Sequence, residues 1–411
     1  MRMRAPGRGL VAVALTGAGF GCARPRAAVA EASVHWVGTW EAAPQLTEAR
    51  NLPPAPGLAG STLRQIAHVS LGGSQLRVRL SNEFGNGAVT IGGARVAGSD
   101  TGGTGAIVVG SDRALTFRGQ MGVTIPAGGV TLSDQLPFDV AALSDLAITL
   151  AVISAPENVT GHPGSRTTSY LQPGDRGTAA SLPNAMRAEH WYLLSGIDVV
   201  HPRGAAVVVL GNSIADGRGS GTNRQNRWPD NLARRLQLQR ATTDVAVLNA
   251  GIGGNCVLRV CLGPSARERL ERDVLNQVGA RWLIVSEGVN DIGGARTAAA
   301  ADTVAGQLIE AYASIITGAH QRGFRVYGAT ILPFGGSFYD SVDRELARQR
   351  VNTWIRTSGA FDAVIDFDGA MRDNKQPTRL RPDVDGGDHL HPNERGYRVM
   401  ADAIDLTLFS P

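Results

Sequence analysis

Apolar and polar residues alternate in short runs between residues 33 and 202, and glycine, proline, asparagine and aspartate separate the runs. In the segment QLRVRLSNEFGNG, Leu76, Val78 and Leu80 share one side of an extended chain and the arginines between them share the other. Similar runs are AVTIGGARVAG, GVTIPAGGVTLS and DLAITLAVIS. This alternation is typical of half-buried strands. Many such strands without helical periodicity predict a β-sandwich domain, jelly-roll-like, over residues 33–202.

After Pro202 the pattern changes to apolar strands that alternate with amphipathic helices, which predicts a flavodoxin-like doubly wound parallel sheet over residues 203–411. In such sheets the chemistry lies outside the carboxyl ends of the strands. The polar residues that follow each predicted strand are therefore the candidate site residues. The pattern predicts strands near 205–210, 245–249, 282–286, 325–331 and 363–367, and helices near 228–239, 265–278, 299–322, 341–357 and 393–408.

Residues 1–30 have the pattern of a secretory signal peptide. Three arginines precede an apolar run over residues 9–20, and the small residues 28–30 (Ala-Val-Ala) supply a cleavage site. The run is shorter than the roughly 20 residues that span a bilayer, so no stable membrane insertion is predicted. We expect a secreted or periplasmic protein. A lipoprotein acylated at Cys22 is the second alternative, because the preceding Gly-Phe-Gly lacks the aliphatic residue of a lipobox.

Removal of this segment changes what charge and cysteine content indicate. Five arginines and no acidic residue leave with it, so the formal charge falls from +4 to −1. No cluster of basic residues remains to support nucleic-acid binding. Cys256 and Cys261 are the two cysteines that stay, five positions apart. In an exported protein, where disulfides persist, this spacing favours a local bridge over two reduced thiols.

Two polar segments follow the first two predicted strands. Ser213, in VVVLGNSIADGRGS, comes directly after the first strand. A serine there is either the cap of the next helix or a nucleophile, and this stretch alone does not separate the two. The second strand ends in NAGIGGN, where Gly254 leaves a backbone N–H free to face a ligand. That loop is either an oxyanion-hole element or only a glycine-rich turn.

Two further segments follow the third strand and precede the last helix. SEGVNDIGG offers Asn290, whose uncharged amide suits an oxyanion, and Asp291, which we expect to cap a helix or turn. DVDGGDHLHPNERGY places Asp388 near His391. A carboxylate beside an imidazole fixes its tautomer and enables it to act as a general base toward a serine.

A metal site is the competing interpretation of this last segment, since its aspartates and histidines are all possible ligands. It lacks a cysteine pair, a His-x3-His helix and the twelve-residue calcium-loop pattern, so we predict no catalytic metal and no cofactor. Among the other histidines, His162 in GHPGSRTTSY is expected to be structural. A loop that overhangs the site and contacts substrate is the alternative for it.

Taken together in this order, the four segments resemble the blocks of the SGNH (GDSL) hydrolase superfamily. The resemblance implies that Ser213 is the nucleophile and that Asp388 and His391 complete a catalytic triad. It implies an oxyanion hole made by the backbone N–H groups of Ser213 and Gly254 and by the side-chain amide of Asn290. It covers residues 205–408, and the segments VGTWEAAPQ and HWYLLSGIDV resemble the β-rich N-terminal part of bacterial secreted members near the xylan-esterase-like branch.

One residue departs from the family pattern. The first block is usually Gly-Asp-Ser, whereas this chain has Gly-Asn-Ser, with Asn212 before the serine. In the family this aspartate supports the site and is not the triad acid. Because an amide also donates hydrogen bonds and carries no charge, we expect altered pH behaviour or a modest loss of rate.

The resemblance implies a secreted serine esterase that acts on short-chain carboxylic esters, in the first place O-acetyl groups on carbohydrate. A short acyl chain is expected because the sequence offers no long apolar segment to cover the site. The expected partner is a small-molecule or polysaccharide ester. The alternatives are a lipase or arylesterase of the same fold, and a non-catalytic carbohydrate-binding protein with a decayed site. A Cys256–Cys261 bridge directly after Gly254 would hold the oxyanion loop in shape.

Overall fold

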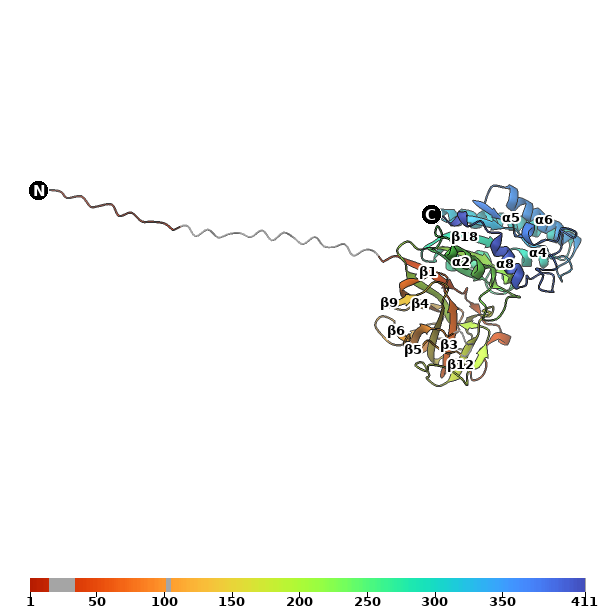
Figure 1. Ribbon diagram of the computed structural model, residues 1–411, viewed down its shortest axis with the longest axis horizontal. Coiled ribbons are helices and arrows are strands. Elements are labelled where there is room, and N and C mark those ends of the chain that lie inside the picture. Colours follow the sequence, from red (N-terminus) through yellow and green to blue (C-terminus); the bar gives the residue numbers. More distant parts are fainter. Residues whose placement is uncertain (15–33, 101–104, 411) are drawn as a thin grey trace. The chain divides into compact units, whose positions relative to one another are not determined.

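The computed structural model describes residues 1–14, 34–100 and 105–410 (Figure 1). The cleavage site at 28–30, Cys22 and the second half of the apolar run over 9–20 lie outside these residues. Residues 1–14 are exposed and form no helix or strand. Among the described residues, no helix combines the length and the apolar composition needed to cross a membrane.

The β-rich part, between Trp36 and Val200, consists of antiparallel sheets and is drawn in red to yellow-green in Figure 1. One sheet has the order β1-β15-β4-β8, with β9 also on β4, and the other has the order β13-β12-β3-β10-β5-β6, with β7 also on β5. A small third sheet has the order β14-β11-β2. The strands are β1 Trp36–Glu41, β2 Gln45–Leu46, β3 Ser61–His68, β4 Gly73–Asn82, β5 Val89–Gly98, β6 Arg113–Leu115, β7 Val123–Ile125, β8 Gly129–Leu132, β9 Leu136–Val140, β10 Asp145–Ser154, β11 Thr160–His162, β12 Ser169–Pro173, β13 Met186–Ala188, β14 Trp191–Tyr192 and β15 Leu194–Val200.

Apolar side chains of the two large sheets meet in one core, which is the arrangement of a sandwich. Leu76, Val78 and Leu80 of β4 are fully buried in this core, together with Ile148 and Leu150 of β10 in the opposite sheet. The arginines between the three β4 residues are partly exposed. The predicted alternation in this strand and the predicted β-rich N-terminal part are confirmed.

The α/β part begins at β16 and contains a five-stranded parallel sheet of order β17-β16-β18-β19-β20. In chain order this is 2-1-3-4-5, the order of flavodoxin-like sheets. The predicted α/β class is confirmed. The strands are β16 Ala205–Gly211, β17 Val245–Gly251, β18 Ala280–Ser286, β19 Arg325–Ala329 and β20 Ala363–Ile365.

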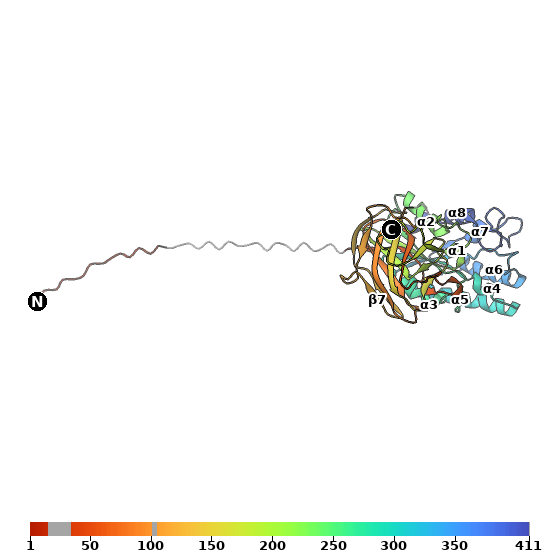
Figure 2. The ribbon, with the colours of Figure 1, turned by 90° about the horizontal axis from the view of Figure 1, so that it is seen from below.

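Helices cover both faces of this sheet, as the near-continuous apolar character of its strands requires. Along β16, Val208 packs toward α5 and α6, whereas Val207 packs toward α2 and α8. Figure 2 shows α2, α7 and α8 apart from α3, α5 and α6. The helices are α1 Ser213–Asp216, α2 Trp228–Leu238, α3 Ala266–Leu270, α4 Val289–Gly293, α5 Ala298–Gln321, α6 Val342–Thr357, α7 Phe367–Met371 and α8 Glu394–Asp402.

Several predicted elements have other bounds in the structure. The helix predicted over 265–278 is α3 followed by a π-helical turn over Glu271–Leu275. The helix predicted over 393–408 ends at Asp402, and a separate 3-10 turn follows over Leu406–Phe409 because the side chain of Asp405 caps it. The fifth strand stops at Ile365 because Asp366 accepts a hydrogen bond from the backbone of Gly369 and caps α7.

The β-rich part and the α/β part pack directly against each other. Val37 and Leu71 belong to the same buried cluster as Leu248 of β17. The backbone N–H of Val247 donates to Oγ of Ser70 at 2.9 Å. From His35 onward the chain forms one compact unit. Loops of the β-rich part can therefore reach the carboxyl ends of the parallel strands.

Candidate active site

Ser213 lies at the start of α1, directly after β16. The side chain that caps this helical turn is Asn212, whose Oδ1 accepts from the backbone N–H of Ile214 at 3.1 Å. The hydroxyl of Ser213 is therefore free for another partner, and its Oγ lies 2.8 Å from Nε2 of His391. Ser213 is 7% exposed. The cap of this turn is thus Asn212, and the hydroxyl of Ser213 is directed at His391.

His391 lies in the segment before α8 and contacts Asp388 through two groups. Its Nδ1 is 2.7 Å from Oδ2 of Asp388, and its backbone N–H donates to Oδ1 at 2.8 Å. Burial raises the pKa of Asp388, but the hydrogen bonds and charge of His391 outweigh it and leave that pKa below its ordinary value. Asp388 is therefore ionised at neutral pH and orients the imidazole so that Nε2 faces Ser213.

The pKa of His391 depends on its burial, on Asp388 and on two nearby arginines. Burial lowers the pKa of His391, Asp388 opposes this change, and the charges of Arg218 and Arg166 lower the pKa further. The imidazole is then neutral at pH 7 and able to accept a proton. The hydrogen-bonded series Asp388–His391–Ser213 has the contacts that a general base and its nucleophile require.

Ser213, His391, Gly254 and Asn290 line one cavity of about 370 Å³, here called the Ser213 cavity. Gly254 has a φ of +71°, in the left-handed region that favours glycine. Nδ2 of Asn290 donates to the backbone oxygen of Asn255 at 2.7 Å, which leaves its second N–H for a ligand. The hydroxyl of Tyr339 donates to Oδ1 of Asn290 at 3.0 Å and so fixes the orientation of the amide.

Asp291 does not cap a helix or turn in the manner expected. Its two carboxylate oxygens accept from the backbone N–H groups of Val257 and Leu258, at 2.9 and 3.0 Å. It therefore holds the loop after β17 against α4. The same loop contains a disulfide between Cys256 and Cys261, with an Sγ–Sγ distance of 1.98 Å.

Arg269 of α3 is a residue that sequence reasoning missed. Its guanidinium is fully buried and donates to the backbone oxygens of Gly211 at 3.0 Å and Ala250 at 2.6 Å. It also donates to Oδ1 of Asn255 at 3.0 Å and pairs with Asp273 at 3.2 Å. Arg269 thus ties the end of β16 to the glycine-rich loop after β17. The only sequence signal is the i, i+4 spacing of Arg269 and Asp273, which is common on helix surfaces.

Glu287 is a second missed residue, behind Ser213. The carboxyl group is completely buried, and its Oε2 accepts from Nδ2 of Asn212 at 3.2 Å. Burial raises the pKa of Glu287 to about 8, although Arg269 at 3.6 Å opposes this. Asn212 therefore donates to a carboxyl group that is mostly protonated at neutral pH.

His162, in β11 of the β-rich part, contacts α1 of the α/β part. Its Nε2 is 2.8 Å from Oδ1 of Asp216, its Nδ1 is 2.9 Å from the backbone oxygen of Ala43, and its side chain is buried. Asp216 lines the Ser213 cavity, whereas His162 does not. His162 therefore fixes the helical turn that begins with Ser213.

The two histidines near the C-terminus pair separately, His389 with Asp385 and His391 with Asp388. Within the described ranges, no group of three or more histidine, cysteine, aspartate and glutamate side chains is placed to hold a metal ion.

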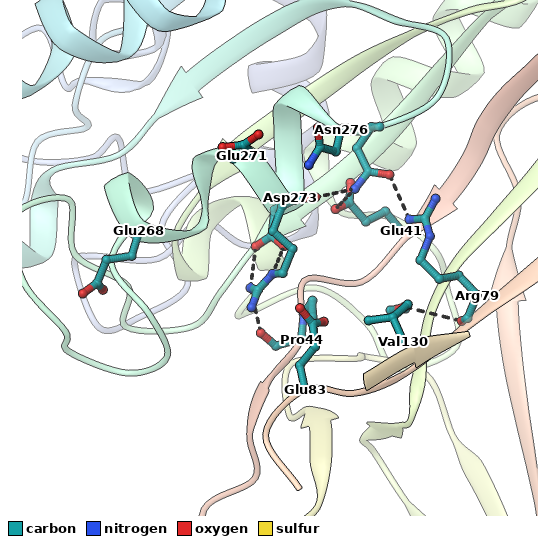
Figure 3. A pocket seen from close by; sticks show the side chains of 12 residues that line it. Glu41, Pro44, Arg79, Glu83, Val130, Glu268, Glu271, Asp273 and Asn276 are labelled. Carbon is teal, nitrogen blue, oxygen red and sulfur yellow. Dashed lines mark hydrogen bonds and ion pairs between the residues drawn. The ribbon is translucent and has the colours of Figure 1, made fainter. Parts of the chain in front are cut away.

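A second cavity, the Glu41 cavity, lies at the junction of the β-rich part and the π-helical turn (Figure 3). Nε2 of Gln277 donates to Oε1 of Glu41 at 3.0 Å, and burial raises the pKa of Glu41 well above its ordinary value. Asp273, on the same wall, is the partner of Arg269. The residues that line this cavity include Ser195 but no histidine, so they offer no serine–histidine pair.

Residues 209–399 match the model of the GDSL-like Lipase/Acylhydrolase family. No curated protein matches the chain.

Three solved structures illustrate the similarity. A putative lipolytic protein of the G-D-S-L family from Desulfitobacterium hafniense is 16% identical, with 49% of this chain and 97% of that chain covered and a TM-score of 0.37. A GDSL-like lipase from Bacteroides thetaiotaomicron is 19% identical over 50% of this chain and 88% of that chain, with a TM-score of 0.37. An acetylxylan esterase from Geobacillus stearothermophilus is 20% identical over 49% of this chain and 94% of that chain, with a TM-score of 0.38.

The family match spans the segments that carry Ser213, Gly254, Asn290, Asp388 and His391. Over residues 209–399 the α/β part is similar to the GDSL-like lipase/acylhydrolase family, and this match supports a carboxylic ester hydrolase of the SGNH superfamily.

Proposed function

We propose that this hydrolase is a serine esterase for short-chain carboxylic esters, with O-acetyl groups on carbohydrate as the preferred substrate. The observation that carries the proposal is the 2.8 Å contact between Oγ of Ser213 and Nε2 of His391 at the wall of the Ser213 cavity. A serine hydroxyl needs such a base to become nucleophilic at neutral pH.

The reaction follows from these contacts. His391 accepts the proton of Ser213 as Oγ attacks the ester carbonyl carbon, and Asp388 stabilises the imidazolium that forms. The negative charge that develops on the carbonyl oxygen is stabilised by hydrogen bonds. The donors are the backbone N–H groups of Ser213 and Gly254 and the free side-chain N–H of Asn290. The intermediate collapses, His391 protonates the departing alcohol, and an acyl group stays on Ser213. Water, deprotonated by His391, then releases the carboxylic acid and restores the serine.

The size and chemistry of the Ser213 cavity favour a small acyl group and a hydroxylated alcohol. Its volume of about 370 Å³ lies at the small end of ligand sites. Most of its lining residues are polar or charged, including Glu48, Asn51 and Glu189 from the β-rich part. Such groups suit the hydroxyls of a sugar, whereas a long acyl chain would require an apolar channel.

A chain-length series tests this proposal. Wild-type protein and Ser213→Ala are compared on 4-nitrophenyl acetate, butyrate and octanoate and on acetylated xylan. We expect kcat/KM to fall from acetate to octanoate, acetate to be released from the polysaccharide, and all turnover to disappear in Ser213→Ala. A preference for octanoate would favour a lipase instead, and turnover that survives in Ser213→Ala would refute the role of Ser213.

We also propose that the protein is exported. The pattern of the first 30 residues and the Cys256–Cys261 disulfide support this proposal, since disulfides persist outside the reducing cytosol. N-terminal sequencing of the protein from its producing cells tests it, and a mature chain that begins at Glu31 is expected. A chain in the cytosolic fraction that retains Met1 would contradict it.

A further inference from the structure

Three arginines, Arg50, Arg166 and Arg218, line the Ser213 cavity together with Ser213 and His391. Arg166 and Arg218 are the two whose charges act on His391. Arg166 comes from the loop between β11 and β12 of the β-rich part, and Arg218 from the loop after α1. Within the described parts of the chain, neither guanidinium forms an ion pair or a side-chain hydrogen bond. Nε of Arg166 is buried and has no partner. A buried N–H group without a partner is rare in folded proteins and calls for an explanation.

The backbone holds both arginines in place. Arg166 has a φ of +49°, in the left-handed region that is uncommon for a residue with a side chain. Its backbone oxygen accepts from the N–H of Asn223 at 2.9 Å, and Oδ1 of Asn223 accepts from the N–H of Thr168 at 2.7 Å. These bonds fix a loop of the β-rich part over the α/β part. Backbone strain of this kind is often kept where it positions a functional group.

Arg218 is attached to the turn that contains the proposed nucleophile. Its backbone N–H donates to the backbone oxygen of Ser213 at 2.9 Å, and its backbone oxygen accepts from the hydroxyl of Tyr397 at 2.5 Å. The two arginines therefore approach the cavity from different parts of the fold. Both lie close enough to His391 for their charges to lower its pKa.

The carboxylates of the same cavity do not neutralise these arginines. Glu48 accepts from the side-chain amides of Gln45 and Asn51, at 3.3 and 2.7 Å. Glu189 accepts from the hydroxyl of Thr222 at 3.0 Å, and Asp216 pairs with His162. Among the described residues, Arg166 and Arg218 thus have no ion-pair partner and face the space beside Ser213.

We propose that Arg166 and Arg218 form a subsite that binds a carboxylate of the substrate, so that the preferred ester carries an anionic group near the scissile bond. The inference rests on the proposed function and narrows its substrate class. Guanidinium groups present paired N–H donors that match the two oxygens of a carboxylate. The carboxylate belongs either to the alcohol, as in an acetylated sugar acid, or to the acyl group.

Two matched pairs of esters test the proposal and distinguish the two sources. In 4-acetoxybenzoate the carboxylate is on the alcohol part, and methyl 4-acetoxybenzoate is its neutral counterpart. In mono-4-nitrophenyl succinate the carboxylate is on the acyl part, and 4-nitrophenyl butyrate is the counterpart. For one of the pairs we expect kcat/KM to be about tenfold higher for the anionic member, in line with a charge-assisted hydrogen bond. The ratio should fall as ionic strength rises.

Substitutions then assign the preference to the two arginines. In Arg166→Gln and Arg218→Gln the ratio of anionic to neutral kcat/KM should fall toward one, whereas Arg166→Lys, which retains the charge, should keep part of it. Arg240→Gln removes an exposed arginine that does not line the cavity, and should leave the ratio unchanged. Hydrolysis of the neutral esters without preference in either pair would overturn this inference alone. If folded wild-type protein hydrolyses no ester, the proposed function fails and this inference fails with it.

Discussion

The side-chain amide of Asn212 donates a hydrogen bond to the carboxyl group of Glu287 at 3.2 Å, directly behind the turn that presents Ser213. The same side chain caps that turn through its Oδ1, which accepts from Ile214. An aspartate at this position would keep the cap but lose the donor. Asn212 thus both caps the turn and donates to Glu287, whereas the aspartate of the Gly-Asp-Ser pattern could only do the first.

Asn212→Asp should destabilise the protein in a pH-dependent way. At pH 5 Glu287 is protonated and can donate to the new carboxylate, because burial raises its pKa to about 8. Above pH 8 two carboxylates face each other, and the free energy of unfolding should fall further below that of the wild type. Urea denaturation at pH 5 and pH 9 measures the two differences. Asn212→Ala is the control: it loses a cap worth about 1 kcal/mol and the donor to Glu287 but adds no charge, so the change with pH should be smaller than in Asn212→Asp. Equal losses for Asn212→Asp at the two pH values would refute the role of Glu287.

Glu287→Gln should make the protein more stable than the wild type at alkaline pH. In the unfolded chain this carboxyl loses its proton near its ordinary pKa of 4.5, whereas in the folded chain it holds the proton until about pH 8. The unfolded state therefore binds fewer protons between these values, and wild-type stability declines as pH rises, on the order of 1.4 kcal/mol per pH unit. Glutamine resembles the protonated acid and removes this decline. Parallel stability curves for the two proteins from pH 5 to pH 9 would contradict the prediction.

Arg269→Met should lower kcat more than it changes KM. Arg269 touches the backbone behind Ser213 and the glycine-rich loop but does not line the Ser213 cavity. Its loss should also lower stability, because the buried carboxylate of Asp273 then keeps only its ion pair with Arg272. The double variant Arg269→Met/Asp273→Asn should recover much of the stability and little of kcat. If kcat returns together with stability, Arg269 is only structural.

The pH profile of kcat/KM should reflect His391. Because burial and the neighbouring arginines lower its pKa beneath the ordinary 6.5, activity should rise with pH through a midpoint under that value. Arg218→Gln removes one of the lowering charges and should shift the midpoint upward. Steady-state rates on 4-nitrophenyl acetate from pH 4 to pH 8 measure both midpoints. A midpoint that Arg218→Gln leaves in place would show that this charge does not reach the imidazole.

The sequence pattern predicted the positions of the parallel strands, and with them the residues that gather at their carboxyl ends. Ser213, Gly254, Asn290 and His391 meet at one cavity because each follows a strand or precedes the last helix. The pattern could not show that Asn212, and not Ser213, caps α1, because both side chains suit a cap. Nor could it place Arg269 or Arg166. Arg269 binds backbone oxygens that are distant in sequence, and Arg166 lines a cavity whose other residues are mostly distant in sequence. A buried arginine also looks the same in a sequence as an exposed one.

The most direct test of the proposed nucleophile is covalent labelling with a fluorophosphonate probe, followed by mass spectrometry of the labelled peptide. We expect one label, on Ser213, which is lost in Ser213→Ala and forms more slowly in His391→Ala, since the imidazole activates the hydroxyl. A label on another serine, or no label on folded wild-type protein, would contradict the assignment of Ser213 as the nucleophile.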